Sequence, residues 1–299
     1  MPERFSCAEH SLAVDEPAYA TASQVRRWIL VEQPGAWGVD AVLSSAMPVD
    51  VATRLRAVAR AARARLLFIR RHGRSEPEQR VCFAVLSTAD VRRVESLAFA
   101  DPAQLLSVDW SPLQIGEPVG GQTVDDPLYL VCTNGRHDAC CARFGRPVAQ
   151  ALTESLGEQV WESSHFGGDR FAANVVCLPD GIYYGRVSAA DATRLVQLHG
   201  DGGIDLAHYR GRSFQPFVAQ AAEHFVRSKF GLFAIDEAVA NQVDDLGGGL
   251  FRVAVTTSAG AAVLATVECT PAGTAQQLTC RSISEEHPPR YRLVDVRLD

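Results

Sequence analysis

The chain has 299 residues, of which 47% are apolar and 21% are charged, a composition typical of a globular protein of about two domains. Its formal net charge is 29 − 35 = −6 at pH 7, which argues against non-specific binding to nucleic acid or to an acidic membrane surface. Residues 1–15 lack the apolar core of a secretory signal, and the longest weakly polar run, 253–267, is short for a membrane span. We therefore expect a cytoplasmic protein that binds neither nucleic acid nor membrane.

Apolar runs and turn residues predict the order β-α-β-β-α in the first part of the chain. The predicted elements are a strand at 28–32, a helix at 51–66, strands at 66–69 and 81–86, and a helix at 90–99. Thr88 is expected to cap the last of these helices. The helix at 51–66 has an arginine-rich face, which we interpret as a solvent face; docking of an acidic partner is the alternative.

The same order recurs in the second part of the chain. The predicted elements are a strand at 128–131, a helix at 147–156 with Pro147 in its first turn, a strand at 160–163, a hairpin of 175–178 with 182–186, and a helix that begins at Ser188. Two β-α-β-β-α units suggest a distant internal duplication of a thioredoxin-like unit. The predicted fold class is therefore α/β, with a divergent thioredoxin-like unit preceding a second one.

The C-terminal part changes character. A helix is predicted at 213–229, with Gly231 after its end. Four short strands are then predicted at 251–257, 261–268, 277–283 and 291–298. These strands form a small β-rich appendage of unknown role. The predicted domains are an N-terminal α/β domain at 1–122, a thioredoxin-like domain at 123–232 and the appendage at 233–299.

Two groups of candidate metal ligands follow strand ends in the second unit. Cys132 and Cys141 leave eight residues between them, and His165 and Asp169 leave three. Two soft ligands on one loop and two further candidates on another are what a metal cluster held between two loops requires. Cys141 precedes the predicted helix, and a helix dipole favours a thiolate near its N-terminus. Gly167 and Gly168 would let their N–H groups approach an inorganic ion.

The other cysteines are too sparse for a disulfide scaffold, and a reducing compartment would keep them as thiols. Cys82 and Cys177 lie within apolar strands, so we interpret both as small buried side chains. Cys7 stands alone in the sequence. Cys269 and Cys280 could face each other across a hairpin, although their segments resemble plain strands.

These motifs resemble those of the sucrase/ferredoxin-like family. The matching pieces are Cys132-x8-Cys141, His165-x-Gly-Gly-x-Arg-Phe-Ala, the run Leu-Pro-Asp-Gly-Ile-Tyr-Tyr-Gly-Arg-Val that ends at Val187, and the opening Trp-Ile-Leu-Val-Glu-Gln-Pro-Gly-Ala-Trp-Gly from Trp28 to Gly38. The resemblance covers residues 28–196. It implies a thioredoxin-like ferredoxin domain that carries a [2Fe–2S] cluster with two cysteine and two histidine ligands.

By this resemblance, Cys132 and Cys141 would bind one iron and His165 the other. Family members with the mixed ligand set have a second histidine at the fourth position, where this chain has Asp169. Asp169 is then a ligand, a hydrogen-bond partner of His165, or a mark of a lost cluster. Cys140 and His137 are the possible substitutes for the fourth ligand.

The resemblance implies a soluble electron-transfer protein that accepts an electron from a redox partner such as a reductase. Two other functions remain open: thiol redox chemistry without a metal, by Cys140 with Cys141 or Cys132, and a cluster-free binding protein. A Cys-x-x-Cys motif, which thioredoxin-type catalysis favours, is absent from the sequence. Zinc is a minor alternative to iron. No catalytic residue is assigned, and nothing in the residues supports sucrase activity.

Overall fold

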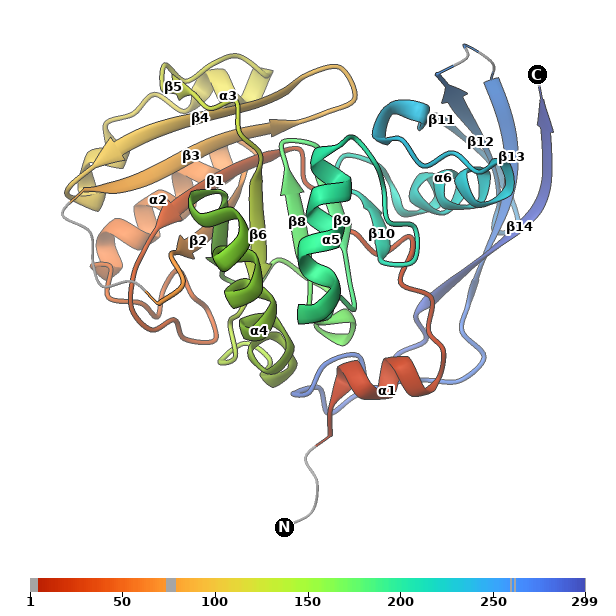
Figure 1. Cartoon of the computed structure of the whole chain (residues 1–299), viewed down its shortest axis with the longest axis horizontal. Helices are drawn as coiled ribbons and strands as arrows, with labels where there is room; N and C mark the ends of the chain where they lie inside the picture. Colours follow the sequence, from red (N-terminus) through yellow and green to blue (C-terminus); the bar gives the residue numbers. More distant parts are fainter. Residues whose placement is uncertain (1–4, 74–78, 259, 261, 299) are drawn as a thin grey trace.

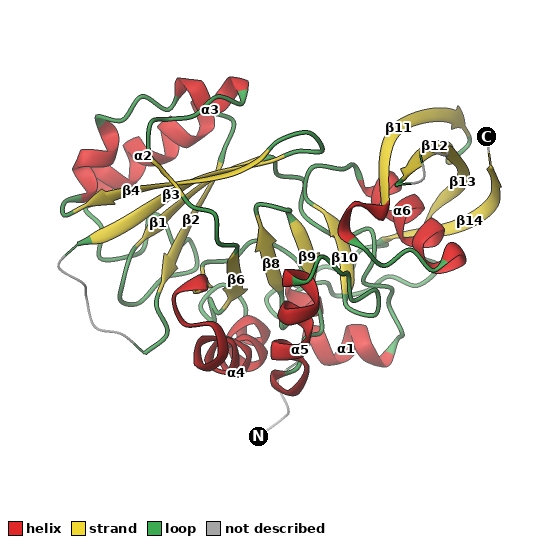
Figure 2. Ribbon diagram, turned by 45° about the horizontal axis from the view of Figure 1, so that its top comes forward, coloured by secondary structure: helices red, strands yellow, loops and turns green. Residues whose placement is uncertain are grey.

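The computed structural model describes residues 5–73, 79–258, 260 and 262–298 (Figure 1). Two sheets organise these residues. A ten-stranded sheet has the order β10-β9-β8-β6-β7-β2-β1-β3-β4-β5, and a separate four-stranded sheet has the order β11-β12-β13-β14. Figure 2 shows the small sheet at one end of the molecule, with a helix between it and the large sheet. Among the described residues, none of the helices has the length and apolar character that crossing a membrane demands.

The first half of the large sheet is a β-α-β-β-β unit. Its elements are β1 (Arg27–Glu32), α2 (Val49–Ala61), β2 (Arg65–Arg70), β3 (Arg80–Ser87) and β4 (Arg92–Phe99). The strands lie in the order β2-β1-β3-β4, with β1 parallel to β2 and antiparallel to β3. Val51 and Leu55 of α2 pack against Ile29, Val31 and Phe68 on one face of this half-sheet. The arginine-rich side of the helix is thereby left outside the core.

The second half repeats this strand arrangement. Its elements are β6 (Leu128–Cys132), α4 (Ala139–Leu156), β7 (Val160–Ser163), β8 (Val175–Leu178), β9 (Ile182–Tyr184) and α5 (Ala189–Gly200). The order is β7-β6-β8-β9, with β6 parallel to β7 and antiparallel to β8. A parallel β-α-β pair followed by an antiparallel hairpin is the thioredoxin-like arrangement, and both halves have it. The predicted fold class is confirmed.

The two halves join through equivalent strands. β2 pairs with β7 in antiparallel fashion, with Ile69 opposite Ser163 and Arg70 opposite Glu162. The helix α2 covers one half, while α4 and α5 cover the other. Side chains on the remaining sheet faces, such as Trp28 and Leu130, meet in one shared apolar cluster. This shared core fixes the two halves against each other.

The remaining elements surround this frame. They are α1 (Cys7–Ala13), η1 (Pro102–Leu106), α3 (Ser111–Ile115), β5 (Gln122–Thr123), η2 (Gly157–Gln159), η3 (Asp169–Phe171), β10 (Tyr209–Arg212), α6 (Phe217–Phe230), η4 (Ile235–Glu237), β11 (Ala238–Gly247), β12 (Leu250–Thr257), β13 (Ala262–Pro271) and β14 (Pro289–Leu298). α6 packs Ala221 and Val226 against Val253 and Val255 of the small sheet. The β-rich appendage is thus attached through a helix.

The predicted helix at 90–99 is wrong, because these residues form the strand β4. Thr88 closes a tight turn instead of capping a helix: its hydroxyl accepts a hydrogen bond from the N–H of Val91 at 2.9 Å. β4 then pairs along its whole length with β3. Glu95, Leu97 and Ala98 have no strong local preference for a strand, so pairing with a neighbouring strand decided the conformation.

The predicted start of the helix at 147–156 is also wrong. The helix begins at Ala139, because the Asp138 side chain accepts a hydrogen bond from the N–H of Cys140 and caps it there. Pro147 consequently lies inside the helix instead of in its first turn. The helix predicted at 213–229 begins later, at Phe217, because Ser213 pairs with the backbone of Gly181.

Besides β4, three strands were not predicted, namely the two-residue β5, β10 and β11, and one predicted strand is wrong. Residues 277–283 form an irregular loop, and the missing fourth strand of the small sheet is β11. β10 was not predicted either. Both β10 and β11 are rich in polar or small residues, which weakens the alternating apolar pattern. Ala261, the first residue of the strand predicted at 261–268, lies outside the described residues.

Candidate metal centre

The two cysteines of the predicted site lie together in the core. Cys132 is the last residue of β6, and Cys141 lies in the first turn of α4; both are buried. The sulfur of each lies 3.7 Å from Nδ1 of His165. All three ligand atoms are within 4.8 Å of one another. The structure therefore gathers three of the four predicted ligands around one point.

Gly145 allows α4 to approach the end of β6. A Cβ atom on this residue would lie 2.1 Å from the carbonyl oxygen of Cys132, which is far inside van der Waals contact. Any larger side chain would push the helix away from the strand. Because Cys141 lies on this helix, the distance between the two thiols depends on the absence of a side chain at Gly145.

The loop that carries His165 is held by a buried arginine. Arg210 of β10 donates to the carbonyl oxygen of Gly167 at 3.2 Å and to Oδ1 of Asn174 at 2.8 Å. Asn174 in turn donates to the carbonyl oxygen of Gly168 at 2.8 Å. Gly168 has a φ of +85°, and a Cβ there would lie 2.2 Å from the Arg210 guanidinium. This glycine lets the loop pack directly on the arginine.

Asp169 lies against His165 and away from the sulfurs. His165 Nε2 and Asp169 Oδ1 are 2.9 Å apart. The ring of His137 stacks on that of His165 with centroids 3.8 Å apart, and its Nε2 is 3.9 Å from Asp169 Oδ2. His137, His165 and Asp169 thus form a second group of ligand atoms, which shares His165 with the thiol group.

The charges in the site are coupled. The hydrogen bond from Cys141 holds the pKa of Cys132 well below its usual value, and the same bond, together with burial, raises the pKa of Cys141. Burial disfavours protonation of His165, but hydrogen bonds to Asp169 and Cys132 outweigh it and raise its pKa to about 9. Cys132 therefore loses its proton more readily than Cys141, although the helix position predicts the lower pKa for Cys141.

A cavity of about 390 Å³ opens beside the two histidines. The side chains of His165 and His137 are 16% and 34% exposed, whereas the two cysteines are buried. Three arginines and one aspartate line the same cavity, and the aspartate is paired with the first arginine: Arg56, Arg60, Arg65 and Asp40. The imidazoles thus lie between the thiols and solvent, in positively charged surroundings.

The structure separates Cys140 from the predicted site. Its sulfur lies 3.4 Å from that of Cys280, in a different group of side chains. Cys280 and Cys269 do not face each other, because Cys269 of β13 is paired with Tyr291 of β14. Sequence reasoning missed Arg210 and Asn174. The short run Tyr-Arg-Gly-Arg at 209–212 gave no strand signal, so nothing pointed to a buried arginine there.

The fold and this donor set define a thioredoxin-like protein with a candidate metal centre at the ends of two parallel strands. A family model described as Sucrase/ferredoxin-like matches residues 18–211, which is more than half of the chain. The chain belongs to the sucrase/ferredoxin-like family. No curated protein matches it.

The chain is also similar to solved structures of a small ferredoxin. One is the thioredoxin-like [2Fe-2S] ferredoxin from Aquifex aeolicus, at 22% identity and a TM-score of 0.28, over 31% of this chain and 97% of that chain. Two cysteine-to-serine variants of the Aquifex aeolicus ferredoxin match at 23% and 26% identity, with TM-scores of 0.25 and 0.24. They cover 28% and 26% of this chain, and 97% and 89% of their own.

Proposed function

We propose that this protein is an electron carrier with a [2Fe–2S] cluster bound by cysteine and histidine. The observation that carries the proposal is the pair of overlapping groups that share His165, with thiols on one side and imidazole and carboxylate groups on the other. A mixed ligand set of this kind fits a two-iron cluster in which imidazoles replace thiolates on one iron. When bound, such a cluster takes up and releases one electron.

Cys132 and Cys141 are the ligands proposed for the first iron. They project from the end of a strand and the first turn of a helix, which are rigid supports. The lowered pKa of Cys132 favours loss of its proton, and metal binding removes the proton of any ligand that is still a thiol. The cysteines are buried, so solvent does not compete for the iron on this side.

His165 and His137 are the ligands proposed for the second iron. A metal-binding histidine usually has its other ring nitrogen held by a carboxylate or a backbone carbonyl. His165 meets this condition through Asp169, and Nδ1 of His137 lies 3.3 Å from the carbonyl oxygen of Val39. Each imidazole therefore keeps one nitrogen available. Asp169 then acts by orienting His165 and is not itself a ligand.

The cavity beside the histidines is the proposed side of electron entry. The imidazoles are the most exposed part of the site, and electron transfer requires a close approach to the metal. Arg60 and Arg65 give this side a net positive charge, whereas Arg56 is paired with Asp40, which lines the same cavity. A redox partner with an acidic surface, such as a reductase, would be attracted to it.

The test is the visible absorption spectrum of anaerobically purified protein, with iron and acid-labile sulfide measured on the same sample. We expect about two irons and two sulfides per chain. Cys132→Ser and His137→Ala should each lose most of the iron. Cys177→Ala is the matched control, because Cys177 is a buried cysteine of the neighbouring strand β8 outside both groups.

Three outcomes would contradict the proposal in different ways. A protein without iron or sulfide, even after anaerobic reconstitution, would overturn the electron carrier. One zinc per chain that depends on Cys132, with no sulfide, would identify a mononuclear site, which the 3.7 Å spacing of the sulfurs and His165 Nδ1 also suits. Full iron retention in His137→Ala would remove only His137 from the ligand set.

A further inference from the structure

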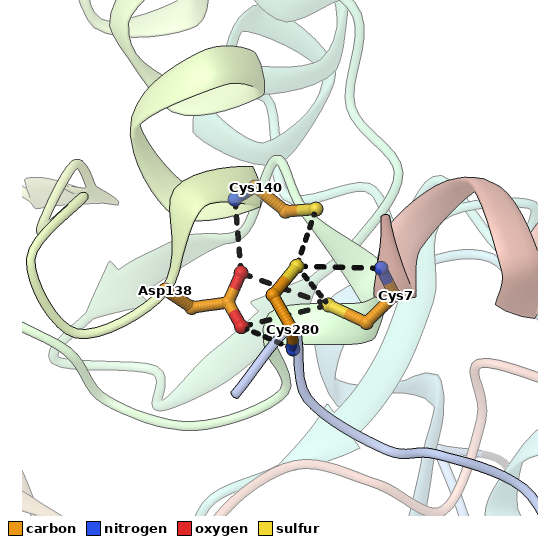
Figure 3. Close-up of side chains that lie close together, drawn as sticks. All are labelled: Cys7, Asp138, Cys140 and Cys280. Carbon is orange, nitrogen blue, oxygen red and sulfur yellow. Dashed lines mark hydrogen bonds between the residues drawn. The ribbon is translucent and has the colours of Figure 1, made fainter. Parts of the chain in front are cut away.

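A second group of thiols lies where three distant parts of the chain meet (Figure 3). Cys7 begins α1, Cys140 lies in the first turn of α4, and Cys280 lies in the loop between β13 and β14. Asp138, the cap of α4, completes the group. Cys280 is 140 residues from Cys140 and 273 residues from Cys7 in the sequence. Local structure therefore does not account for their meeting.

The spacing of these side chains is that of ligands around one ion. The sulfur of Cys280 is 3.4 Å from that of Cys140 and 3.5 Å from that of Cys7. Both carboxylate oxygens of Asp138 are 3.7 Å from the Cys7 sulfur. All four residues offer ligand atoms within 4.8 Å of one another. Tetrahedral zinc, with Zn–S bonds of about 2.3 Å, separates its sulfurs by about 3.8 Å.

We propose that Cys7, Asp138, Cys140 and Cys280 bind one zinc ion at a structural site separate from the candidate metal centre. Three cysteines and a carboxylate make a complete set of four protein ligands, which is the mark of a structural and not a catalytic zinc site. Cys7, Asp138 and Cys140 are buried and Cys280 is half-buried, so no position is left open for a substrate.

Groups around the ligands support the same assignment. The N–H of Cys7 donates to the Cys280 sulfur at 3.4 Å, and the Ser6 hydroxyl lies 3.3 Å from the Cys140 sulfur. Asp138 accepts hydrogen bonds from the N–H groups of Cys140 at 2.9 Å and Cys280 at 2.7 Å. Such outer contacts orient metal ligands and disperse the charge of thiolates.

The buried carboxylate of Asp138 favours the binding of a cation. Among the described residues, no lysine or arginine forms an ion pair with it, and its side chain is almost fully buried. A buried charge of this kind is costly unless a counter-charge compensates it. A disulfide between two of the three cysteines would leave the third thiol unpaired and this carboxylate with hydrogen bonds from backbone N–H groups but no counter-charge. A divalent ion accounts for all four side chains.

The zinc would connect α1 and the loop between β13 and β14 to α4. Cys140 and Cys141 are neighbours in the first turn of that helix, yet their sulfurs belong to different groups. The zinc therefore fixes, from outside, the turn that carries one ligand of the candidate metal centre. We infer that the site stabilises the protein and takes no part in electron transfer.

The experiment measures zinc and iron per chain in full-length protein purified anaerobically from zinc-containing medium. Wild type, Cys280→Ser and Cys269→Ser are compared. Cys269 lies in β13 outside the group, so it serves as the matched control. We expect Cys280→Ser to lose one equivalent of zinc, to keep its iron and its visible spectrum, and to have a lower Tm. Cys269→Ser should keep the zinc.

Equal zinc in wild type and Cys280→Ser would overturn the proposal, as would wild type that takes up no zinc under reducing conditions. An intact mass two hydrogens lower, with a disulfide mapped to Cys140 and Cys280, would also overturn it. If Cys280→Ser does not fold, cobalt substitution of wild type decides, because tetrahedral cobalt with three thiolates has intense visible bands. The iron and acid-labile sulfide contents of wild type test the iron–sulfur proposal separately, because the zinc site does not depend on them.

Discussion

His165 and Asp169 form a pair in which the carboxylate holds one ring nitrogen and leaves the other facing two sulfurs. Nε2 of His165 is 2.9 Å from Asp169 Oδ1, while Nδ1 lies 3.7 Å from the sulfurs of both Cys132 and Cys141. The arrangement resembles a carboxylate–histidine–metal relay. In the proposed metal centre, Asp169 would orient His165 and would not itself bind metal.

The first prediction concerns Asp169. Asp169→Asn keeps a hydrogen-bond acceptor for His165 but removes the negative charge, so the cluster should be retained with a higher reduction potential. The pKa of His165 should fall, because the Asp169 carboxylate is one of the groups that raise it. Redox titration over a range of pH checks both effects. Complete loss of iron from Asp169→Asn would show that the carboxylate itself binds metal.

The second prediction concerns Gly145. Gly145→Ala places a Cβ on the carbonyl oxygen of Cys132, so α4 must move away from β6. We expect a loss of ~1–3 kcal/mol in the free energy of unfolding and weaker metal retention. Chemical denaturation and iron content measure the two effects. Gly273→Ala is the control, since no atom of the described residues, apart from its chain neighbours, lies within 4 Å of a Cβ there. Similar losses in both variants would refute the packing argument.

The third prediction concerns a buried ion network that links α6 to β10. Glu223 accepts hydrogen bonds from Arg212 at 2.9 Å and Arg227 at 3.0 Å, and all three side chains are fully buried. Glu223→Gln leaves two buried guanidinium groups uncompensated, which should cost ~3–5 kcal/mol in stability. Urea denaturation measures the loss.

The matched control for Glu223 is Glu268→Gln. Glu268 pairs with Arg292 across β13 and β14, where the arginine side chain is 67% exposed. An exposed pair of this kind contributes about 0–1 kcal/mol. Comparable effects of the two substitutions would mean that burial does not set the strength of the Glu223 network.

The fourth prediction concerns the pH dependence of stability. Burial lowers the pKa of His224 to about 4, and among the described residues its Nδ1 has no hydrogen-bond partner. As the pH falls from about 6.5 to 4, His224 binds a proton in the unfolded chain but not in the native protein, so stability falls. We expect His224 to account for ~1–3 kcal/mol of that loss.

His224→Phe isolates this contribution. The phenyl ring can keep the stacking on Tyr19, whose ring centroid is 4.2 Å from that of His224. The difference in unfolding free energy between wild type and variant, measured from pH 7 to pH 4, should move in favour of the variant as the pH falls. A difference that stays constant over this range would show that His224 does not titrate between the two states.

Much of the fold follows from local patterns. The strands near 28–32, 128–131 and 160–163 are buried apolar runs, so their sequence alone indicates them. The meeting of Cys132 and His165 also follows, since both come after parallel neighbours whose carboxyl ends share one edge of the sheet. The conformation of β4 did not follow, because its residues suit a helix until β3 offers a partner.

The sequence by itself determined which residue types can bind a metal and which segments carry them. Only the tertiary structure decided how they are grouped. It placed Cys140 with Cys7 and Cys280, turned Asp169 toward His165, and set Arg210 beneath the histidine loop. The physical reason is that the periodicity of apolar residues indicates which side of a segment is buried. Which distant side chain a residue contacts depends on the packing of the whole chain.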